Sequence, residues 1–181
     1  MKIRSVRFNV IMNFIYTVSS IIFPMITFPY VTRVLLVEGN GKVAAATSVI
    51  TYLTMIASLG IPTYGIRACA KVREDARRLS KTVQELLIIN TATTVVTYAV
   101  FLLLLFTVPQ FQEEQSLYAV MSINMLLNVV GVSWLYSALE QYAYITVRSL
   151  VFKILSIILM FLFVKEPADY VVYGGITVFA T

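Results

Sequence analysis

Long runs without a charged side chain constrain the fold of this chain more than any other feature of its sequence. Residues 8–32, 43–66, 86–109 and 115–139 contain no Asp, Glu, Lys or Arg. At about 1.5 Å per residue, each run is long enough to cross the roughly 30 Å hydrocarbon core of a bilayer as a helix. The chain is also 59% hydrophobic and 13% charged, against about 45–50% and 25% in soluble domains. We therefore expect an all-α fold, a polytopic membrane helix bundle.

Two further spans are expected in the last third of the chain. The apolar run 154–164 is too short to cross a bilayer alone, so the fifth span must borrow residues upstream and is expected at 145–164. A sixth span at 170–181 has about half of the roughly 20 residues that a crossing needs when the sequence stops. We interpret residues 1–181 as a single incomplete transmembrane lobe of six helices, with the last helix truncated.

Basic residues are distributed unevenly between the links that join these spans. With the N-terminus in the cytoplasm, three of the 14 Lys and Arg residues lie outside, namely Arg33, Lys42 and Lys165, and the other eleven lie inside. Because cytoplasmic links carry the excess of Lys and Arg, we expect a cytoplasmic N-terminus. The basic segment 67–85 then faces the headgroups of membrane lipids. Three i,i+4 pairs predict that it continues as a helix out of the bilayer: Lys71/Asp75, Glu74/Arg78 and Lys81/Glu85.

The residue inventory excludes several kinds of chemistry. The chain has no His and a single Cys, Cys69, so it offers no imidazole base, disulfide, zinc cluster or CxxC pair. We expect no metal, no cofactor and no catalytic residues. The net charge of +5 does not predict nucleic acid binding, because the basic residues separate apolar spans instead of lining one water-facing surface.

Ionisable residues at membrane depth are the candidate functional residues, because an ionised side chain there is costly unless it faces protein or water. Lys153 lies about eight residues inside the fifth span, about 12 Å deep, which is too far for easy snorkelling. Arg148 lies only about three residues inside and can reach the headgroups. Functionally, both cations would line a water-filled cavity and bind phosphate oxygens.

A structural interpretation of the same residues stays open. On one helix, Glu140, Tyr144 and Arg148 would share a face at i, i+4 and i+8, whereas a break between the fourth and fifth spans would separate them. In the structural interpretation, Glu140 neutralises Arg148 and the pair fixes helix packing. Asn124 and Asn128 lie one turn apart and predict either hydrogen bonds between helices or contacts with a ligand.

Two groups of helix-breaking residues predict local irregularity. Pro24 and Pro29 remove backbone hydrogen bonds from the first span. The two prolines either form a hinge, or they are tolerated in a helix that ends near the headgroups at Arg33. Gly60, Pro62 and Gly65 together, at the inner end of the second span, predict a bend or the end of the helix.

Several motifs resemble the N-terminal half of bacterial oligosaccharide flippases. They are FPYVTRVL at 28–35, SLGIPTYGIR at 58–67, GVSWLY at 131–136, ALEQY at 138–142 and YITVRS at 144–149, followed by Lys153. These polysaccharide-biosynthesis transporters share a superfamily with multidrug and toxin extruders and peptidoglycan-precursor flippases. Two positions depart from the family pattern: Ser133 stands where an Asp is expected, and Leu36 where a Gly is expected. The first departure removes a possible cavity carboxylate.

The resemblance implies a two-lobe exporter fold in the bacterial cytoplasmic (inner) membrane, of which this chain would be one six-helix lobe. The two lobes surround a central cavity that opens alternately to either side. The implied substrate is an undecaprenyl-pyrophosphate-linked oligosaccharide, the repeat unit of an O-antigen, capsule or exopolysaccharide. Polysaccharide polymerase and chain-length machinery are the further partners we expect. Together with the polar residues at membrane depth, the family resemblance predicts which residues contact the substrate: Arg33, Asn124, Asn128, Trp134, Glu140, Tyr144, Arg148 and Lys153.

Three other interpretations remain at this point. A multidrug extruder coupled to Na⁺ or H⁺ would favour embedded carboxylates, and Glu140, at the edge of a span, is the lone carboxylate nearby. A membrane enzyme, such as a glycan polymerase or an acyltransferase, would call for a large outer loop or for a His. A homodimer of six-helix chains is the third, which the short last span disfavours.

Overall fold

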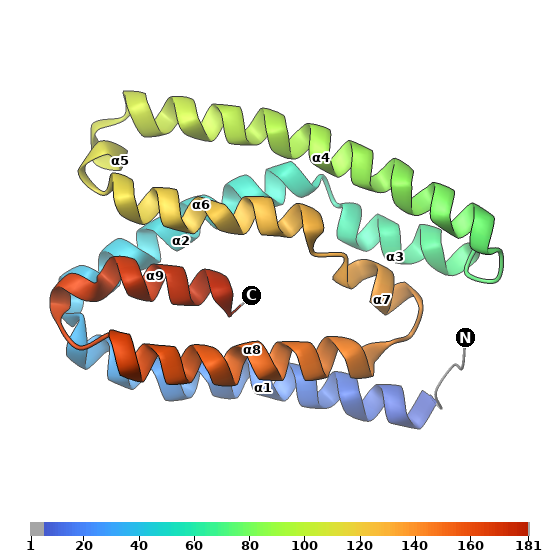
Figure 1. The fold of residues 1–181 in the computed structure, drawn as a ribbon, viewed down its shortest axis with the longest axis horizontal. Helices are drawn as coiled ribbons and strands as arrows, with labels where there is room; N and C mark the ends of the chain where they lie inside the picture. The colour runs from blue at the N-terminus through green and yellow to red at the C-terminus, as the bar shows by residue number, and fades with distance from the viewer. Residues whose placement is uncertain (1–5, 181) are drawn as a thin grey trace.

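The computed structural model describes residues 6–180, and α-helix dominates this range. The described residues form nine α-helices and one short 3₁₀ helix, η1, and they contain no strand (Figure 1). The expected all-α helix bundle is therefore confirmed. The elements are α1 (Val6–Val34), α2 (Leu36–Ser58), α3 (Ile61–Lys71), α4 (Ala76–Thr107), α5 (Pro109–Glu113), α6 (Gln115–Val130), α7 (Ser133–Ala138), α8 (Tyr142–Phe163), η1 (Pro167–Asp169) and α9 (Tyr170–Phe179).

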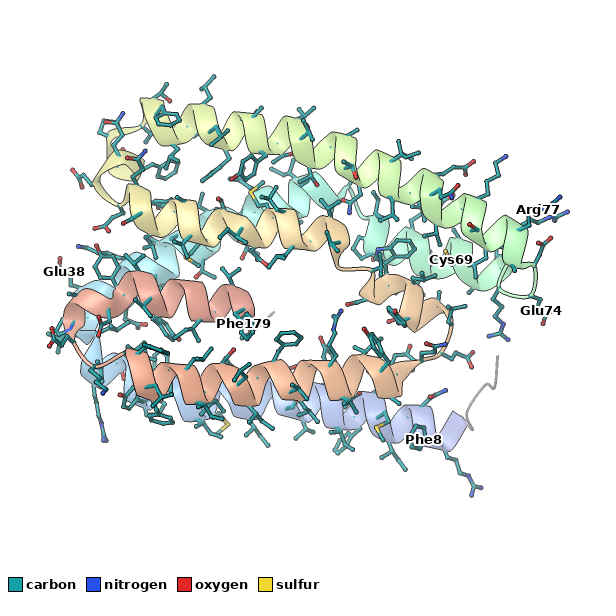
Figure 2. The ribbon with its side chains drawn as sticks, viewed as in Figure 1. Phe8, Glu38, Cys69, Glu74, Arg77 and Phe179 are labelled. Atoms are coloured by element: carbon teal, nitrogen blue, oxygen red, sulfur yellow. The ribbon has the colours of Figure 1, made fainter. Side chains whose placement is uncertain are left out.

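Five segments are long and apolar enough to cross a membrane: most of α1, α2 with α3, α4, α6 with α7, and α8. The segments run back and forth between two ends of the bundle (Figure 1). One end carries the α3–α4 turn, where Glu74 and Arg77 project, and we call it the Arg73 end (Figure 2). The other end carries the α1–α2 junction near Glu38, and we call it the Lys42 end.

The α1–α2 junction is tighter than the charge pattern predicts. The sequence suggested a link between Arg33 and Val43, but α2 begins at Leu36, one residue after the break at Leu35. The polar residues of this stretch are accommodated within helix. Gly39 packs beside η1: a Cβ there would be 3.4 Å from the carbonyl oxygen of Pro167, an ordinary contact, and 3.2 Å from the Cβ of Leu35, a tight one.

Proline does not interrupt α1. The helix runs through both Pro24 and Pro29. Within this stretch the hydroxyl of Thr27 donates to the carbonyl of Phe23 at 3.1 Å, and that of Thr32 donates to the carbonyl of Phe28 at 2.9 Å. Such local hydroxyl bonds are one way in which membrane helices accommodate proline.

Two helices break and continue, and their continuations pack together. Between α2 and α3 the backbone of Leu59 (φ 45°) and Gly60 (φ 72°) is left-handed, so the expected irregularity at Gly60 is a bend followed by a further helix. Between α6 and α7 the chain breaks at Gly131 and Val132. The short helix α7 then packs on α3 and α8, which brings the end of the fourth span next to the candidate residues of the fifth.

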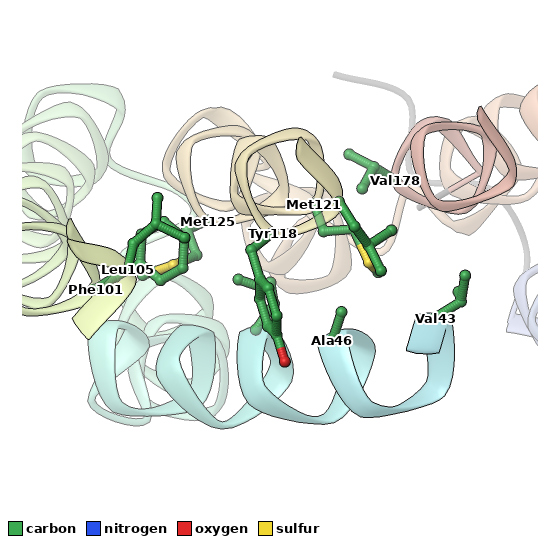
Figure 3. Packing of buried hydrophobic residues seen from close by; sticks show 10 residues of the cluster. Val43, Ala46, Phe101, Leu105, Tyr118, Met121, Met125 and Val178 are labelled. Atoms are coloured by element: carbon green, nitrogen blue, oxygen red, sulfur yellow. The ribbon is translucent and has the colours of Figure 1, made fainter. Parts of the chain in front are cut away.

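Buried apolar residues form three clusters. The first joins α2, α4, α6 and α9 (Figure 3). The second joins α1, α8 and α9 through Val31, Met160 and Ile176, and the third joins α3, α4 and α7 through Cys69, Leu86 and Trp134. Figure 1 shows α1 and α8 side by side along their length, with α9 between α8 and α6. The α1–α8 pair, which carries Lys153, thus has its own packing cluster.

Candidate functional site

Lys153 lies at the middle of α8. It is the twelfth residue of the helix Tyr142–Phe163, so a rise of about 1.5 Å per residue puts it about 15 Å from either helix end. This is deeper than predicted, because α8 begins at Tyr142 and not at Ile145. A lysine stem cannot carry its charge that far to a headgroup region without bending along the helix.

Neutral groups of α1 hold the ammonium of Lys153. Its Nζ donates to Ser20 Oγ at 2.8 Å and to Ser19 Oγ at 3.1 Å. It also lies 5.1 Å from the centre of the Tyr16 ring, within the range of a cation–π contact. In the described part of the chain, no carboxylate forms an ion pair with Lys153. An ammonium at this mid-helix position therefore has no countercharge among the described residues.

Arg148 contacts a different helix. Its Nη2 donates to Ser133 Oγ on α7 at 2.8 Å. Arg148 and Lys153 are five residues apart on α8, which turns them about 140° from each other around the helix axis. They therefore do not share a face: one cation is held by α7, toward the Arg73 end, and the other by α1 at mid-helix. Where the family pattern predicts Asp, Ser133 leaves Arg148 without a countercharge from that position.

The expected pairing of Glu140 with Arg148 is wrong. Glu140 lies in the turn between α7 and α8 with φ 55°, so it is not on one helix with Arg148. Its Oε1 accepts from Arg73 Nη1 at 2.9 Å. The ion pair therefore ties the α3–α4 turn to the α7–α8 turn. Of the two arrangements that the sequence left open, the break between the fourth and fifth spans is the one observed, and it separates Glu140 from the helix of Arg148.

The aromatic candidates lie in contrasting environments. Tyr144 is 48% exposed, and its ring stacks on that of Tyr136 with centroids 4.4 Å apart. Trp134 is only 6% exposed and covers Gly65. In this conformation a sugar ring could reach the Tyr136–Tyr144 stack but not the indole of Trp134.

The remaining candidates lie away from Lys153. Asn128 Oδ1 accepts from Ser58 Oγ at 3.0 Å, which links α6 to α2. Asn124 is partly buried one turn earlier on α6. Arg33 is exposed in the last turn of α1 at the Lys42 end. The structure therefore brings Arg148, Tyr144 and Glu140 to one region around the α7–α8 turn, and separates Arg33 from them.

A second group of charged residues links helices at the Lys42 end of the bundle. Lys42 Nζ bridges Glu38 Oε1 at 3.1 Å and Glu114 Oε1 at 2.9 Å, and Glu114 also bonds to Tyr170. Burial raises the pKa of the Glu114 carboxyl, but the hydrogen bonds from Lys42 and Tyr170 outweigh burial, so the net pKa lies below its ordinary value. These contacts tie α2, α6 and α9 together.

A hollow of about 530 Å³ at the α3–α4 turn contains both signs of charge. Its lining includes Arg73 and Arg78, but Arg73 is paired with Glu140, and Arg78 lies 3.2 Å from Asp75. Lys71, Glu74 and Asp75 also line the hollow, so carboxylates share it with the cations, whereas among the described residues no carboxylate forms an ion pair with Lys153.

Comparison with known proteins decides the family. The model of the family described as "Polysaccharide biosynthesis protein" matches residues 6–181. The chain belongs to this family. The resemblance inferred from the sequence motifs is therefore confirmed, and the match covers every described helix.

Two curated relatives of the chain carry the name "Putative O-antigen transporter". The one from Shigella dysenteriae is 26% identical over 163 residues, which cover 90% of this chain and 41% of the relative. The one from Escherichia coli (strain K12) is 22% identical over 172 residues, covering 95% of this chain and 41% of the relative. The chain thus spans well under half the length of these relatives. No solved structure matches it.

Sequence reasoning missed the α1 side of the Lys153 site. Tyr16, Ser19 and Ser20 lie within a span that was identified by its lack of charge, and hydroxyl groups are common in such helices. The available signal was their spacing: Ser19 and Ser20 follow Tyr16 by one helical turn, so they share its face. Only the pairing of α1 with α8 reveals that this face meets Lys153.

Proposed function

We propose that this family member is one lobe of an alternating-access flippase for undecaprenyl-pyrophosphate-linked oligosaccharide repeat units. Its N-terminus and Arg73 end would face the cytoplasm, and the substrate would move from the inner to the outer leaflet of the cytoplasmic membrane. The observation that carries this proposal is the uncompensated ammonium of Lys153 at the middle of α8. Membership of the polysaccharide biosynthesis family and the names of the two relatives support it.

The chemistry of the substrate explains why such a cation is useful. The pyrophosphate must pass the hydrocarbon core, where an unpaired anion is costly. Charge-assisted hydrogen bonds from Lys and Arg offset that cost. Arg148, nearer the Arg73 end, would contact the phosphates first and Lys153 would contact them deeper, while the lipid tail stays in the bilayer. No covalent step is required.

The sugar would contact neutral groups. The Tyr136–Tyr144 stack presents a ring face at the level of the α7–α8 turn, and Asn124 offers an amide on α6. Trp134 and Asn128 already have packing or hydrogen-bonding roles inside the lobe, which favours an indirect contribution from them.

The pairing of the acidic residues favours this proposal over drug extrusion coupled to Na⁺ or H⁺. Three carboxylates near the spans have a basic partner: Glu38 pairs with Lys42, Glu85 with Lys81, and Glu140 with Arg73. Glu113, which has no ion pair among the described residues, lies outside the spans at the end of α5. A cationic drug or a coupling ion needs an available carboxylate. The group left without a countercharge here is instead a cation, which suits an anionic substrate.

The proposal is tested by replacing Lys153 and Arg148 in the full-length transporter, expressed in a strain that lacks its own. We expect Lys153→Ala to lower surface polysaccharide at least tenfold, with lipid-linked repeat units accumulating on the inner leaflet, and Arg148→Ala to lower it severalfold. Lys165→Ala is the matched control, because it removes one exposed Lys outside α8. Normal export by Lys153→Ala and Arg148→Ala at normal protein level would reject the assignment.

A further inference from the structure

The hydroxyl protons of the two serines that contact Lys153 are already used in other hydrogen bonds. Ser19 Oγ donates to the carbonyl oxygen of Tyr16 at 2.7 Å, and Ser20 Oγ donates to the same oxygen at 3.0 Å. A hydroxyl group has one proton to donate and two lone pairs that accept. Because both protons point to the Tyr16 carbonyl, the serines present only lone pairs to the ammonium of Lys153.

We propose that Tyr16, Ser19 and Ser20, which we call the α1 cradle, position the Lys153 ammonium and keep it cationic without neutralising it. The cradle residues are positioning residues for an anionic group that binds at Lys153. This inference rests on the proposed function, since it assigns a role to the surroundings of the proposed pyrophosphate contact.

The donor count of the ammonium supports this role. A lysine has three N–H donors, of which Ser19 and Ser20 take two. Within the described residues the third has no hydrogen-bond acceptor, and the Tyr16 ring interacts only through its face. An anionic oxygen can therefore bind the third donor while both serine bonds remain, so binding does not begin with the loss of an existing partner.

The neutrality of the cradle separates this arrangement from an ordinary ion pair. A carboxylate in place of Ser20 would hold the ammonium at least as firmly, because charge-assisted hydrogen bonds are shorter and stronger than those of a hydroxyl. It would also cancel the positive charge, so an incoming phosphate would meet a neutral pair and a repelling anion. The other charged side chains of α8 and α1 do not contact Lys153: Arg148 donates to Ser133 on α7, Arg7 lies in the first turn of α1, and Arg33 lies in its last turn at the Lys42 end.

The cradle is not needed to hold α1 against α8. Thr146 Oγ1 donates to the Met12 carbonyl at 2.9 Å, Tyr30 Oη donates to the Val164 carbonyl at 2.8 Å, and Val31 packs in one cluster with Met160. Substitutions at Ser20, which is exposed, are therefore expected to leave the two helices paired.

The test compares Ser20→Asp with Ser20→Asn in the full-length transporter, because the two new side chains have nearly the same shape and differ in charge. We expect Ser20→Asp to lower surface polysaccharide at least tenfold per molecule of membrane-inserted protein, and Ser20→Asn to stay within about threefold of the unmodified protein. Equal export by the two variants, whether normal or lost, would contradict the proposed role of the α1 cradle.

A second comparison tests the hydroxyl groups themselves. The double substitution Ser19→Thr with Ser20→Thr keeps both acceptors and both bonds to the Tyr16 carbonyl, since Thr can bond to the carbonyl one turn back. Replacing both serines by Ala removes them. We expect export at least fivefold higher with the Thr pair than with the Ala pair, and equal export would contradict the inference. Normal export by Lys153→Ala would instead show that the proposed function has failed. Loss with Lys153→Ala beside equal Asp and Asn variants would show that only the cradle has failed.

Discussion

Gly65 of α3 packs directly under the indole of Trp134 on α7. A Cβ at position 65 would lie 2.7 Å from Trp134 Cε3, well inside normal contact. Trp134 is buried with Cys69 and Leu86, so the ring has little room to retreat. The continuation of the second span therefore packs on that of the fourth only because position 65 has no side chain.

Gly65→Ala should destabilise the protein by about 1–3 kcal/mol, the usual cost of overpacking a buried contact. The measurement is the midpoint of thermal unfolding in detergent, together with the amount of protein in the membrane. Gly41→Ala is the matched control: Gly41 is a helical glycine whose added Cβ meets nothing within 4 Å, so it should be neutral or stabilising. An equal effect of the two substitutions on stability would show that the contact with Trp134 does not exclude a side chain at position 65.

Leu36 has a backbone conformation that suits glycine. Its φ is 59° at the junction of α1 and α2, which costs an L-residue about 1–2 kcal/mol. Leu36→Gly should therefore stabilise the protein by about 1 kcal/mol, despite the greater freedom of glycine in the unfolded chain. Val37→Gly, at the next residue, should destabilise it, because Val37 is not among the positive-φ residues. A chemical or thermal unfolding curve for each variant checks the opposite signs.

The sequence was sufficient for the fold class because the all-α bundle follows from long apolar runs. The run 145–164 ends within three residues of both ends of α8, and the run 86–109 ends two residues after Thr107, the last residue of α4. Boundaries set by charge and glycine were less accurate: the stretch 34–42 is polar enough to suggest a link, yet residues 36–42 are helical and Gly39 packs beside Pro167. That contact is tertiary and leaves no local signal.

In the candidate site too, some features follow from the local sequence and others depend on tertiary contacts. The depth of Lys153 could be inferred from the length of its span, whereas its partners depend on which helix lies beside α8. The position of Glu140 stayed open because the break after Ala138 is not encoded by a proline or glycine: its φ of 55° is adopted by a glutamate. Helix periodicity alone therefore could not decide whether Glu140 and Arg148 share a helix.

The Arg73–Glu140 pair should contribute little to stability. Both side chains are more than a third exposed, at 37% and 40%, and exposed ion pairs are worth about 0–1 kcal/mol. A double-mutant cycle with Arg73→Gln and Glu140→Gln, followed by unfolding in detergent, should give a coupling free energy in this range that shrinks with added salt. The corresponding cycle for Arg148→Gln and Glu140→Gln should give a coupling near zero. A larger coupling in the second cycle would restore the pairing that the structure contradicts.

Acidification should weaken the Lys42 end of the bundle through Glu114. Its hydrogen bonds from Lys42 and Tyr170 outweigh burial and hold its pKa below the ordinary value. A carboxyl with a lowered pKa in the folded state contributes stability that is present above its unfolded pKa, about 4.3, and lost as the pH falls through the folded pKa. The thermal unfolding midpoint should therefore be constant near neutral pH and should decrease below about pH 4.

Glu114→Gln should lower the free energy of unfolding at neutral pH by about 1 kcal/mol, and its unfolding midpoint should be less sensitive to acid. Glu113→Gln is the control, because Glu113 has no ion pair among the described residues. An acid dependence in Glu114→Gln equal to that of the unmodified protein would assign the effect to other carboxylates.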